Sequence, residues 1–476
     1  MREDGRGAAE GDAEVAGEEL AFERHLCGKA VEDEVEVDLA GDGDVEGLQG
    51  RCLPEARFLG LVVRGDSSAQ SFVTSTCERE SVANFYREGL ALNPLKQLMA
   101  LPQNEKQERG VLYTPAEIAQ QPATWQTTWR LFGEMRAELA VFLRPAIEEG
   151  WTVFLVGAGT SDYISRSLAG LLRQSWSTEV RAVASTDLLA GREELLIAGR
   201  KYLWISFSRS GDSPEGVAVL EQALASCPNV RHLVVSCNAK GRMVELARAS
   251  TDAMAVVLDD AVNDRSLAMT SSFTNMLLFG QALAELGRSA GFAATLESMT
   301  EAAEYMLDEG ARLAYEVASQ RDRMACFVGA GGLAGAAKES SLKLTELTGG
   351  RVVALSETTL GLRHGPMSAL NAETVFSAYV AGRERQRRYD LDLVREIRAK
   401  GVVRTMVCVG AEESAADHSL WCEAFRGIGD PYRPAVDVIF GQLLGLFASV
   451  ALGVKPDSPS PSGVISRVVP PFTIYP

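Results

Sequence analysis

Three serines at one predicted turn could bind an anion. Ser208, Ser210 and Ser213 follow the apolar run 202–205, which is typical of a buried strand, and precede the helical pattern of residues 217–224. At a strand-to-helix turn, backbone N–H groups and the positive end of the helix point at one place, so an anion binds well there. The pattern favours a phosphate monoester. The alternative is a polar loop in which a serine only caps the helix.

A second turn with hydroxyl groups is predicted at the same edge of the sheet. Gly159, Thr160 and Ser161 follow the apolar run 151–156. In an open parallel sheet, ligands bind beyond the carboxyl ends of the strands, where both turns lie. Two such turns at one crevice are a stronger signal for a phosphate site than either turn alone.

A dinucleotide cofactor is the competing interpretation of these glycine turns. The first turn has Asp162 where a GxGxxG motif needs a small residue, whereas residues 329–334 read Gly-Ala-Gly-Gly-Leu-Ala and fit GxGxxA. That motif alone is a weak signal for NAD. No GxxxxGK[ST] loop occurs in the sequence, which argues against a P-loop kinase. We therefore expect no cofactor.

Three charged residues share one face of the predicted helix 336–347. Glu339, Lys343 and Glu346 are spaced i, i+4 and i+7. One interpretation is a solvent-facing ladder of ion pairs. The other is a buried proton-transfer pair, because this helix directly follows the glycine turn of the second half of the chain.

His364 is a further candidate for proton transfer. It lies between Arg363 and the pair Gly365-Pro366, which places it on a shaped loop rather than on an apolar helical face. A histidine exchanges protons near neutral pH. His364 is therefore either a catalytic residue or a loop side chain bonded to the backbone.

Strands that alternate with helices must position these residues, and a long helix is predicted at 121–148. Apolar runs predict strands at 151–156, 180–183, 202–206, 231–236, 253–258, 325–328, 352–355, 374–380 and 403–409. Residues 325–331 repeat the pattern of residues 153–159, which indicates an internal duplication. The fold class is therefore α/β, with two tandem domains, each a parallel sheet flanked by helices in a flavodoxin-like three-layer sandwich.

The chain divides into five predicted segments. Residues 1–80 are acidic and rich in glycine, and we expect them to be disordered or an artefact of an upstream start codon. A helical segment at 93–149 precedes two domains at 150–300 and 301–455, and a tail at 456–476 is rich in proline and serine.

Composition argues against several classes of protein. The net charge is −17, but residues 1–50 alone hold 16 Asp/Glu against 4 Lys/Arg, and no basic stripe is present to bind nucleic acid. No run of about 18 apolar residues predicts a membrane span, and no apolar signal segment is found, so we expect a cytoplasmic protein. The eight cysteines form no CxxC pair and the four histidines no HExxH motif, so we expect no metal site.

Together these motifs resemble the sugar isomerase (SIS) domain family, with two such domains in tandem. Residues 208–213 resemble its phosphosugar-binding signature S-x-S-G-[DE]-[ST], and residues 159–161 resemble its first-strand turn. Residues 343–346 (Lys-Leu-Thr-Glu) and 363–366 (Arg-His-Gly-Pro) are similar to the catalytic K-L-x-E and [KR]-H-G-P elements of the isomerase half of glucosamine-6-phosphate synthase. The resemblance runs from Asn93 to the C-terminus.

Within that family, the chain looks like the tagatose-6-phosphate ketose/aldose isomerase group, also described as galactosamine-6-phosphate deaminases of the AgaS type. The segments that carry this likeness are 93–95, 453–457 and 461–476. The glutaminase domain of the synthase has no counterpart in the sequence. This difference favours deamination or isomerisation over amination.

The resemblance implies which residues bind the substrate. Serines of both turns would hold the 6-phosphate of a sugar. Arg209 replaces a glutamine of the synthase signature, and Arg467 lies where the synthase tail closes its site with a lysine. The substrate-binding residues implied in this way are Gly159, Thr160, Ser161, Ser208, Arg209, Ser210, Ser213 and Arg467.

The resemblance also implies a mechanism without a metal or an organic cofactor. His364, which can come from a neighbouring subunit in this family, would open the sugar ring, so a homodimer or higher homo-oligomer would complete the site. Glu346 would move a proton between C2 and C1, and Lys343 would stabilise the developing charge or keep Glu346 ionised. An amino sugar would become a ketimine-like species, from which water releases ammonia.

We therefore expect a deaminase/isomerase that converts galactosamine-6-phosphate to tagatose-6-phosphate and ammonia. Two alternatives stay open. One is aldose–ketose isomerisation of tagatose-6-phosphate without deamination, and the other is a non-catalytic phosphosugar-binding regulator. Retention of Glu346, Lys343 and His364 together argues against the regulator, since binding alone needs no proton transfer.

Overall fold

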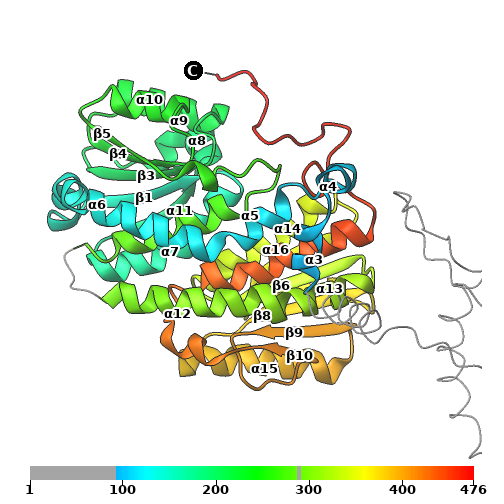
Figure 1. Ribbon diagram of the computed structural model, residues 1–476. Helices are drawn as coiled ribbons and strands as arrows, with labels where there is room; N and C mark the ends of the chain where they lie inside the picture. Colours follow the sequence, from blue (N-terminus) through cyan, green and yellow to red (C-terminus); the bar gives the residue numbers. More distant parts are fainter. Residues whose placement is uncertain (1–92, 287–290, 476) are drawn as a thin grey trace, which may run out of the picture. The chain divides into compact units, whose positions relative to one another are not determined.

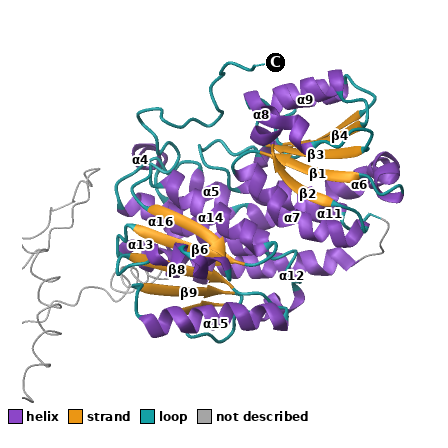
Figure 2. Cartoon of the chain, turned by 180° about the vertical axis from the view of Figure 1, so that it is seen from behind, coloured by secondary structure: helices purple, strands orange, loops and turns teal. Residues whose placement is uncertain are grey.

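Two sheets of parallel strands organise the computed structural model, which describes residues 93–286 and 291–475 (Figures 1 and 2). The acidic segment predicted at 1–80 lies outside the described residues. The first sheet has the order β2-β1-β3-β4-β5. Its strands are β1 (Thr152–Gly157), β2 (Val180–Ala184), β3 (Tyr202–Ser208), β4 (Val230–Ser236) and β5 (Ala253–Val257). All residues of β1 and β3 are buried, as in a sheet covered on both faces.

The second sheet has the order β10-β9-β8-β6-β7, also with all strands parallel. Its strands are β6 (Met324–Gly329), β7 (Val353–Thr358), β8 (Thr374–Tyr379), β9 (Thr405–Val409) and β10 (His418–Leu420). Counted within each half of the chain, both sheets have the order 2-1-3-4-5, which is the flavodoxin-like order. The predicted α/β fold class is confirmed. The three-residue strand β10 was not predicted, because its sequence His-Ser-Leu holds a single apolar residue.

Helices connect the strands and cover the sheets. Those of the first half are α3 (Pro94–Ala100), α4 (Gln103–Arg109), α5 (Thr114–Ala119), α6 (Gln121–Glu148), α7 (Thr160–Trp176), α8 (Ser185–Leu195), α9 (Pro214–Ser226), α10 (Arg242–Arg248) and α11 (Ser271–Leu283). Helix α6 has the predicted bounds. Its buried residues Trp125, Phe132 and Leu139 recur every seven positions and form one stripe that packs against α11.

The second half has its own set of helices. They are α12 (Gly291–Tyr305), α13 (Ala311–Ser319), α14 (Leu333–Leu347), α15 (Glu384–Lys400) and α16 (Pro434–Ala451). Helix α14 packs against both α7 and α16. The packing is close, because a Cβ atom at Gly335 would lie 2.1 Å from Ser167 Oγ of α7, and one at Gly441 of α16 would lie 2.2 Å from Ser340 Oγ. These contacts bring α14 up to the first sheet, where the site lies.

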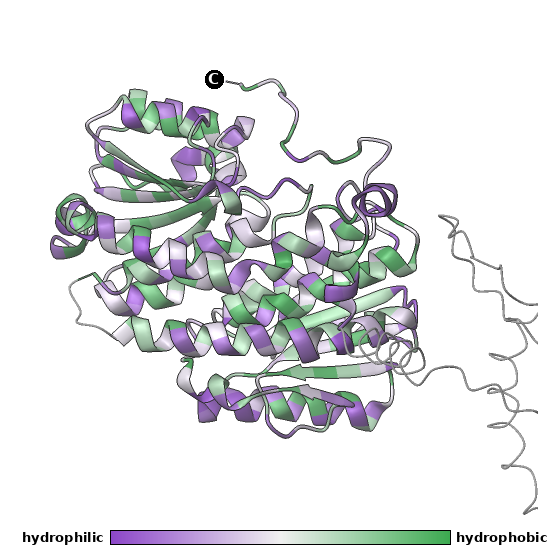
Figure 3. Cartoon of the chain, viewed as in Figure 1, coloured by the Kyte–Doolittle hydropathy of each residue, from purple (hydrophilic) through white to green (hydrophobic). Residues whose placement is uncertain are grey.

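Helix α16 has the length and composition to cross a membrane, although the sequence analysis predicts no membrane span. The helix contains Asp437 and Gln442, and 89% of it is buried inside the structure. It packs against α13 and α14, which is the position of a core helix. Figure 3 colours much of the ribbon of the strands and of these central helices as hydrophobic.

Candidate active site

The serine turn joins β3 to α9, as predicted. Ser208 Oγ accepts a hydrogen bond from the amide of Gly211 (3.0 Å), and Ser210 Oγ accepts one from the amide of Asp212 (3.1 Å). Gly211 has a φ of +69°, a conformation that favours glycine. Because both hydroxyl oxygens accept from the backbone, their protons can point to a ligand.

The turn after β1 supplies a second set of hydroxyl groups. Gly159 precedes α7 with φ +54° and ψ −123°, a region that side chains rarely adopt. Ser161 is buried in the first turn of α7. The hydroxyl of Thr160 donates to Glu339 Oε1 (3.3 Å) and accepts from Lys343 Nζ (3.1 Å). Thr160 therefore ties the first sheet to helix α14.

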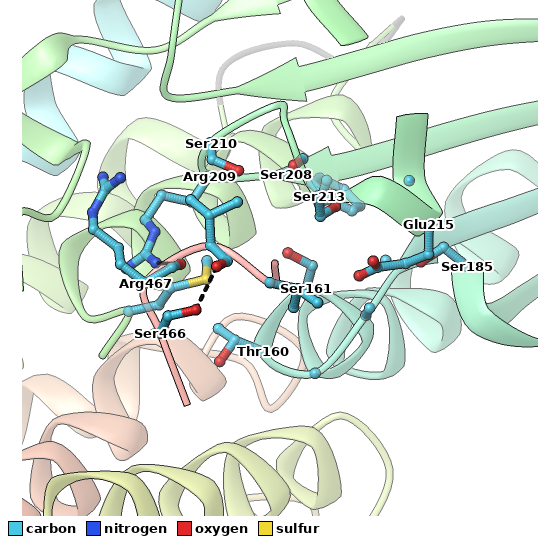
Figure 4. A pocket seen from close by; sticks show the side chains of 18 of the residues that line it. Thr160, Ser161, Ser185, Ser208, Arg209, Ser210, Ser213, Glu215, Ser466 and Arg467 are labelled. Carbon is cyan, nitrogen blue, oxygen red and sulfur yellow. Dashed lines mark hydrogen bonds between the residues drawn. The ribbon is translucent and has the colours of Figure 1, made fainter. Parts of the chain in front are cut away.

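A cavity of about 380 Å³ lies where the two turns meet (Figure 4). Its volume lies in the range of small-molecule sites, about 300–1,000 Å³. Lys343 and Glu346 of α14 form part of the wall, and residues 464–470 of the C-terminal tail form another part. Helices α7, α8 and α9 all begin at the cavity, so three positive helix ends favour an anion there. Ten of the eleven predicted site residues line this cavity.

A buried lysine between two carboxylates forms the second functional cluster. Lys343 Nζ lies 2.5 Å from Glu346 Oε2 and 3.4 Å from Glu339 Oε1. The side chains of Lys343 and Glu339 are 1% and 0% exposed, whereas Glu346 is 22% exposed toward the cavity. The solvent-facing ladder of ion pairs is therefore wrong for this face of α14. The arrangement is a buried lysine held between a buried and a cavity-facing carboxylate, and its role in proton transfer stays a prediction.

The environment shifts the pKa values of this cluster. Burial raises the pKa of Glu339; the Lys343 ammonium opposes this shift and the Glu346 carboxylate adds to it. Burial lowers the pKa of Lys343, but the carboxylates of Glu339 and Glu346 raise it by more, so its net pKa lies above the ordinary value. Lys343 is therefore an ammonium ion at neutral pH, placed to stabilise negative charge at the cavity wall.

His364 is the one predicted site residue that does not line the cavity. It ends the short helix η3 (Gly361–His364), which follows the edge strand β7, and its side chain is exposed. Val353 and Leu360 of the same region are 63% and 46% exposed. Among the described residues, no histidine lines the cavity. The arrangement brings together the lysine, the glutamate and the serines within one chain, but not the histidine.

Two arginines connect the tail to the cavity wall. The Arg209 guanidinium donates to the main-chain oxygen of Arg467 (2.5 Å) and to that of Leu267 (3.0 Å). The Arg467 guanidinium donates to the main-chain oxygen of Asp264 (2.8 Å) and to Asn263 Oδ1 (2.7 Å). Both side chains line the cavity but bind protein oxygens, so a contact with substrate stays a prediction for them.

A carboxylate fixes the start of the tail. Asp457 accepts hydrogen bonds from the amides of Leu112 (2.6 Å) and Thr114 (2.8 Å) and from the Thr114 hydroxyl (2.7 Å). The amide of Leu267 in turn donates to the main-chain oxygen of Asp457 (3.1 Å). These bonds hold the tail at its start, and the arginine contacts hold it again at the cavity.

Sequence reasoning missed four polar residues of the cavity wall, which are Ser185, Ser206, Glu215 and Ser466. Ser185 begins α8 directly after β2, and a strand-end serine could have signalled a third hydroxyl turn. Glu215 lies in the first turn of α9, and its side chain is buried in the wall. An acidic residue in a first helical turn is common, so its type and position carried no signal of a site.

The second glycine turn has a packing role. Residues 329–334 do not line the cavity, and a Cβ atom at Gly332 would lie 2.9 Å from the main-chain oxygen of Ser167. The glycines there allow α7 and α14 to approach. In the described part of the chain, no group of three or more His, Cys, Asp or Glu side chains is placed to hold a metal ion.

Comparison with curated proteins finds clear relatives, although no protein-family model matches the chain. A Streptomyces coelicolor protein, provisionally assigned as D-galactosamine-6-phosphate deaminase AgaS, is 39% identical over 372 residues, which are 77% of this chain and 96% of that protein. The D-galactosamine-6-phosphate deaminase AgaS of Escherichia coli is 32% identical over 369 residues, which are 76% of this chain and 96% of that protein.

A solved structure agrees with these relatives. The tagatose-6-phosphate ketose/aldose isomerase of Escherichia coli superposes with a TM-score of 0.68 at 32% identity, over 76% of this chain and 96% of that chain. The match covers nearly the whole length of that protein, so both sheets and the helices between them have counterparts.

Proposed function

The chain belongs to the family of AgaS-type D-galactosamine-6-phosphate deaminases, and from this premise we propose that it converts galactosamine-6-phosphate to tagatose-6-phosphate and ammonia. One observation carries the proposal. The buried pair of Lys343 and Glu346 faces a cavity that also gathers serine hydroxyls and three helix N-termini. Location in the cytoplasm and assembly into a homodimer belong to the same proposal.

The 6-phosphate binds among the serines in this proposal. Ser161, Ser208, Ser210 and Ser213 line the cavity together, and α7 and α9 begin beside them. Hydroxyl donors and helix N-termini are the groups that hold phosphate in proteins without a metal. A phosphate held there leaves the rest of the sugar to reach Lys343 and Glu346.

The proton transfer then uses the carboxylate that faces the cavity. In the open-chain amino sugar, Glu346 removes the proton from C2 while the C1 carbonyl gains the electrons, and Lys343 stabilises the negative charge on its oxygen. Glu346 returns the proton to C1, and one proton of the amino group moves to the C1 oxygen, which leaves a C1 hydroxyl and a ketimine at C2. Water adds to this ketimine, ammonia leaves, and the ketose remains. The 2.5 Å contact with Lys343 supports an ionised Glu346 as the base.

Ring opening needs a group that both donates and accepts a proton near neutral pH, and among the described residues no histidine lines the cavity of one chain. We assign this role to His364 of a second copy, since His364 is exposed beside the edge strand β7. Val353 at the start of β7 and Leu360 just after it are exposed apolar residues, which supports burial of this edge of the sheet against another chain. The geometry thus favours a site shared between two subunits.

The experiment measures ammonia release from galactosamine-6-phosphate, with glucosamine-6-phosphate and tagatose-6-phosphate alongside, for wild type and Glu346→Gln. Ammonia from wild type alone supports the deaminase. Interconversion of tagatose-6-phosphate without ammonia moves the function to a simple isomerase, which the name of the structural relative also suggests. Binding without turnover of any of the three sugars leaves a phosphosugar-binding regulator.

A further inference from the structure

Glu215 is a buried carboxylate in the cavity wall that the mechanism above does not use. It lies two residues after Ser213, in the first turn of α9, and is 5% exposed. Its Oε2 atom is buried and has no hydrogen-bond partner among the described residues. An unpaired buried carboxylate oxygen costs free energy unless a ligand donates a hydrogen bond to it. The wall therefore presents an acceptor for a ligand proton.

The position of Glu215 points to the phosphate rather than to the reacting carbons. Figure 4 shows its carboxylate directed toward Ser161, with Ser213 close by, and Thr160 and Arg467 on the other side of Ser161 in this view. Thr160 is the residue that binds Lys343. In this view, Glu215 and Thr160, the partner of Lys343, therefore lie on opposite sides of Ser161.

We propose that Glu215 and the sugar phosphate share one proton, so that the site binds the phosphate monoester in a protonated form. The proposal rests on the proposed function in one respect, which is the placement of the phosphate among the serines. An ionised carboxylate and a phosphate dianion repel at contact distance, whereas one proton between them makes a short O–H···O bond. The second pKa of a phosphate monoester is about 6, so above that pH the complex takes the proton from solvent.

Other charged groups do not neutralise Glu215. Within the described residues, Lys343 is paired with Glu346, and the guanidinium groups of Arg209 and Arg467 bind protein oxygens. No ion pair to Glu215 is formed in this part of the chain. Two helices, α8 and α10, pack against α9. The charged groups on these helices and on α7 are Asp162, Arg166 and Arg173 of α7, Asp187, Arg192, Glu193 and Glu194 of α8, Glu215 and Glu221 of α9, and Arg242, Glu245 and Arg248 of α10. Within this set, Arg166 pairs with Asp162, and Arg242 pairs with Glu221 and Glu245.

The test is calorimetric titration with galactitol 6-phosphate, which has no carbonyl group and cannot react. Titration at pH 8 in two buffers of different ionisation enthalpy gives the number of protons taken up. Wild type is expected to take up about one proton, and its affinity is expected to fall roughly tenfold per pH unit above pH 7. Glu215→Gln, whose amide can donate to the dianion, is expected to take up none and to bind at least about tenfold more tightly than wild type at pH 8.

Glu221→Gln is the matched control, because Glu221 lies on the exposed side of the same helix and should leave proton uptake unchanged. Glu215→Ala gives the same test if the glutamine variant does not fold. Two results would overturn the role of Glu215 but not the placement of the phosphate. One is binding by wild type without proton uptake, and the other is equal proton uptake by wild type and the Glu215 variant. If neither protein binds galactitol 6-phosphate or inorganic phosphate, the phosphate placement fails and this proposal with it. If wild type takes up the proton on binding galactitol 6-phosphate but releases no ammonia from galactosamine-6-phosphate, only the proposed deaminase function is rejected.

Discussion

The guanidinium of Arg209 donates a hydrogen bond to the main-chain oxygen of Arg467, which follows it by 258 residues in the chain. Arg209 lies between Ser208 and Ser210, so the serine turn and the tail are joined directly. Further bonds from Arg209 to Ser266 (3.3 Å) and Leu267 (3.0 Å) make it the common anchor of three segments. Tail position and the geometry of the serine turn are therefore coupled.

We predict that Arg209→Lys raises KM more than it lowers kcat. A lysine cannot make the three carbonyl contacts of the planar guanidinium, so the tail wall loosens. We expect KM to rise about tenfold, which corresponds to the loss of one charge-assisted hydrogen bond. Limited proteolysis should cleave the variant near residues 464–470 faster than wild type. Arg248→Lys, an exposed arginine with one carbonyl contact, serves as the control, and equal effects of both would contradict the coupling.

Glu346→Gln should remove catalysis and keep binding. The amide has nearly the same shape but cannot accept the C2 proton, so we expect ammonia release to fall by about 10²–10⁴-fold. Affinity for galactitol 6-phosphate should stay within about threefold, because the serine turns are untouched and the Lys343 ammonium keeps its second partner, the buried carboxylate of Glu339. Circular dichroism checks that the fold is kept. Activity above a tenth of wild type would reject Glu346 as the proton carrier.

Mixing two inactive variants tests whether His364 acts across subunits. His364→Ala and Glu346→Gln are each expected to lose turnover of the sugar phosphate, because the first cannot open the ring and the second cannot move the C2 proton. In a mixed dimer, one site combines the intact Glu346 of one chain with the intact His364 of the other. Random exchange of subunits should therefore restore about a quarter of wild-type activity, as half of the dimers hold one working site of two. No recovery after proven exchange would place His364 outside the shared site.

Stability at acid pH should depend on His232. Its side chain is buried in β4 against Trp204, and burial lowers its pKa to about 4. Because the unfolded chain has the ordinary pKa of about 6.5, the unfolded state binds the proton first as the pH falls. The neutral, buried His232 therefore contributes about 3 kcal/mol to the free energy of unfolding. This contribution is complete above pH 6.5 and is lost between pH 6.5 and 4.

Urea unfolding of wild type and His232→Leu from pH 4 to pH 8 checks the direction of this pH dependence. The leucine variant should lose less stability over the acid range, and the two curves should run parallel above pH 7. His418→Gln, which changes a half-buried histidine of β10, is the control. A parallel decline of wild type and His232→Leu below pH 6.5 would show that other groups cause the acid sensitivity.

Much of the sheet architecture follows from the sequence, because buried parallel strands are continuous apolar runs. The apolar runs of β1 and β3 show where each strand ends. Because the two strands pair in parallel, the turns that follow them bring Ser161 and Ser208 to the same edge of the sheet. Helix α14 carries a charged face that sequence alone leaves open between surface and interior. Its burial depends on the small residues Gly335 and Gly441, which set the distances to two other helices.

Features that depend on contacts between distant segments could not be predicted in this way. Residues 464–470 have no periodic pattern, and only the family resemblance pointed to Arg467 at the site. Their place at the cavity depends on the bond from Arg209 and on the anchor at Asp457. Glu215 looks like an ordinary first-turn acid until its missing partner is seen. The exposure of His364 depends on β7 being an edge strand.

The tail wall also has a consequence for the order of events during protein synthesis. Residues 157–161 and 206–210 leave the ribosome long before residues 464–470, so both sheets can form while the cavity still lacks one side. The nascent enzyme therefore has both serine turns of the cavity before it has the wall that the tail supplies. Turnover would begin only near the completion of translation, when the last segment folds back across the chain.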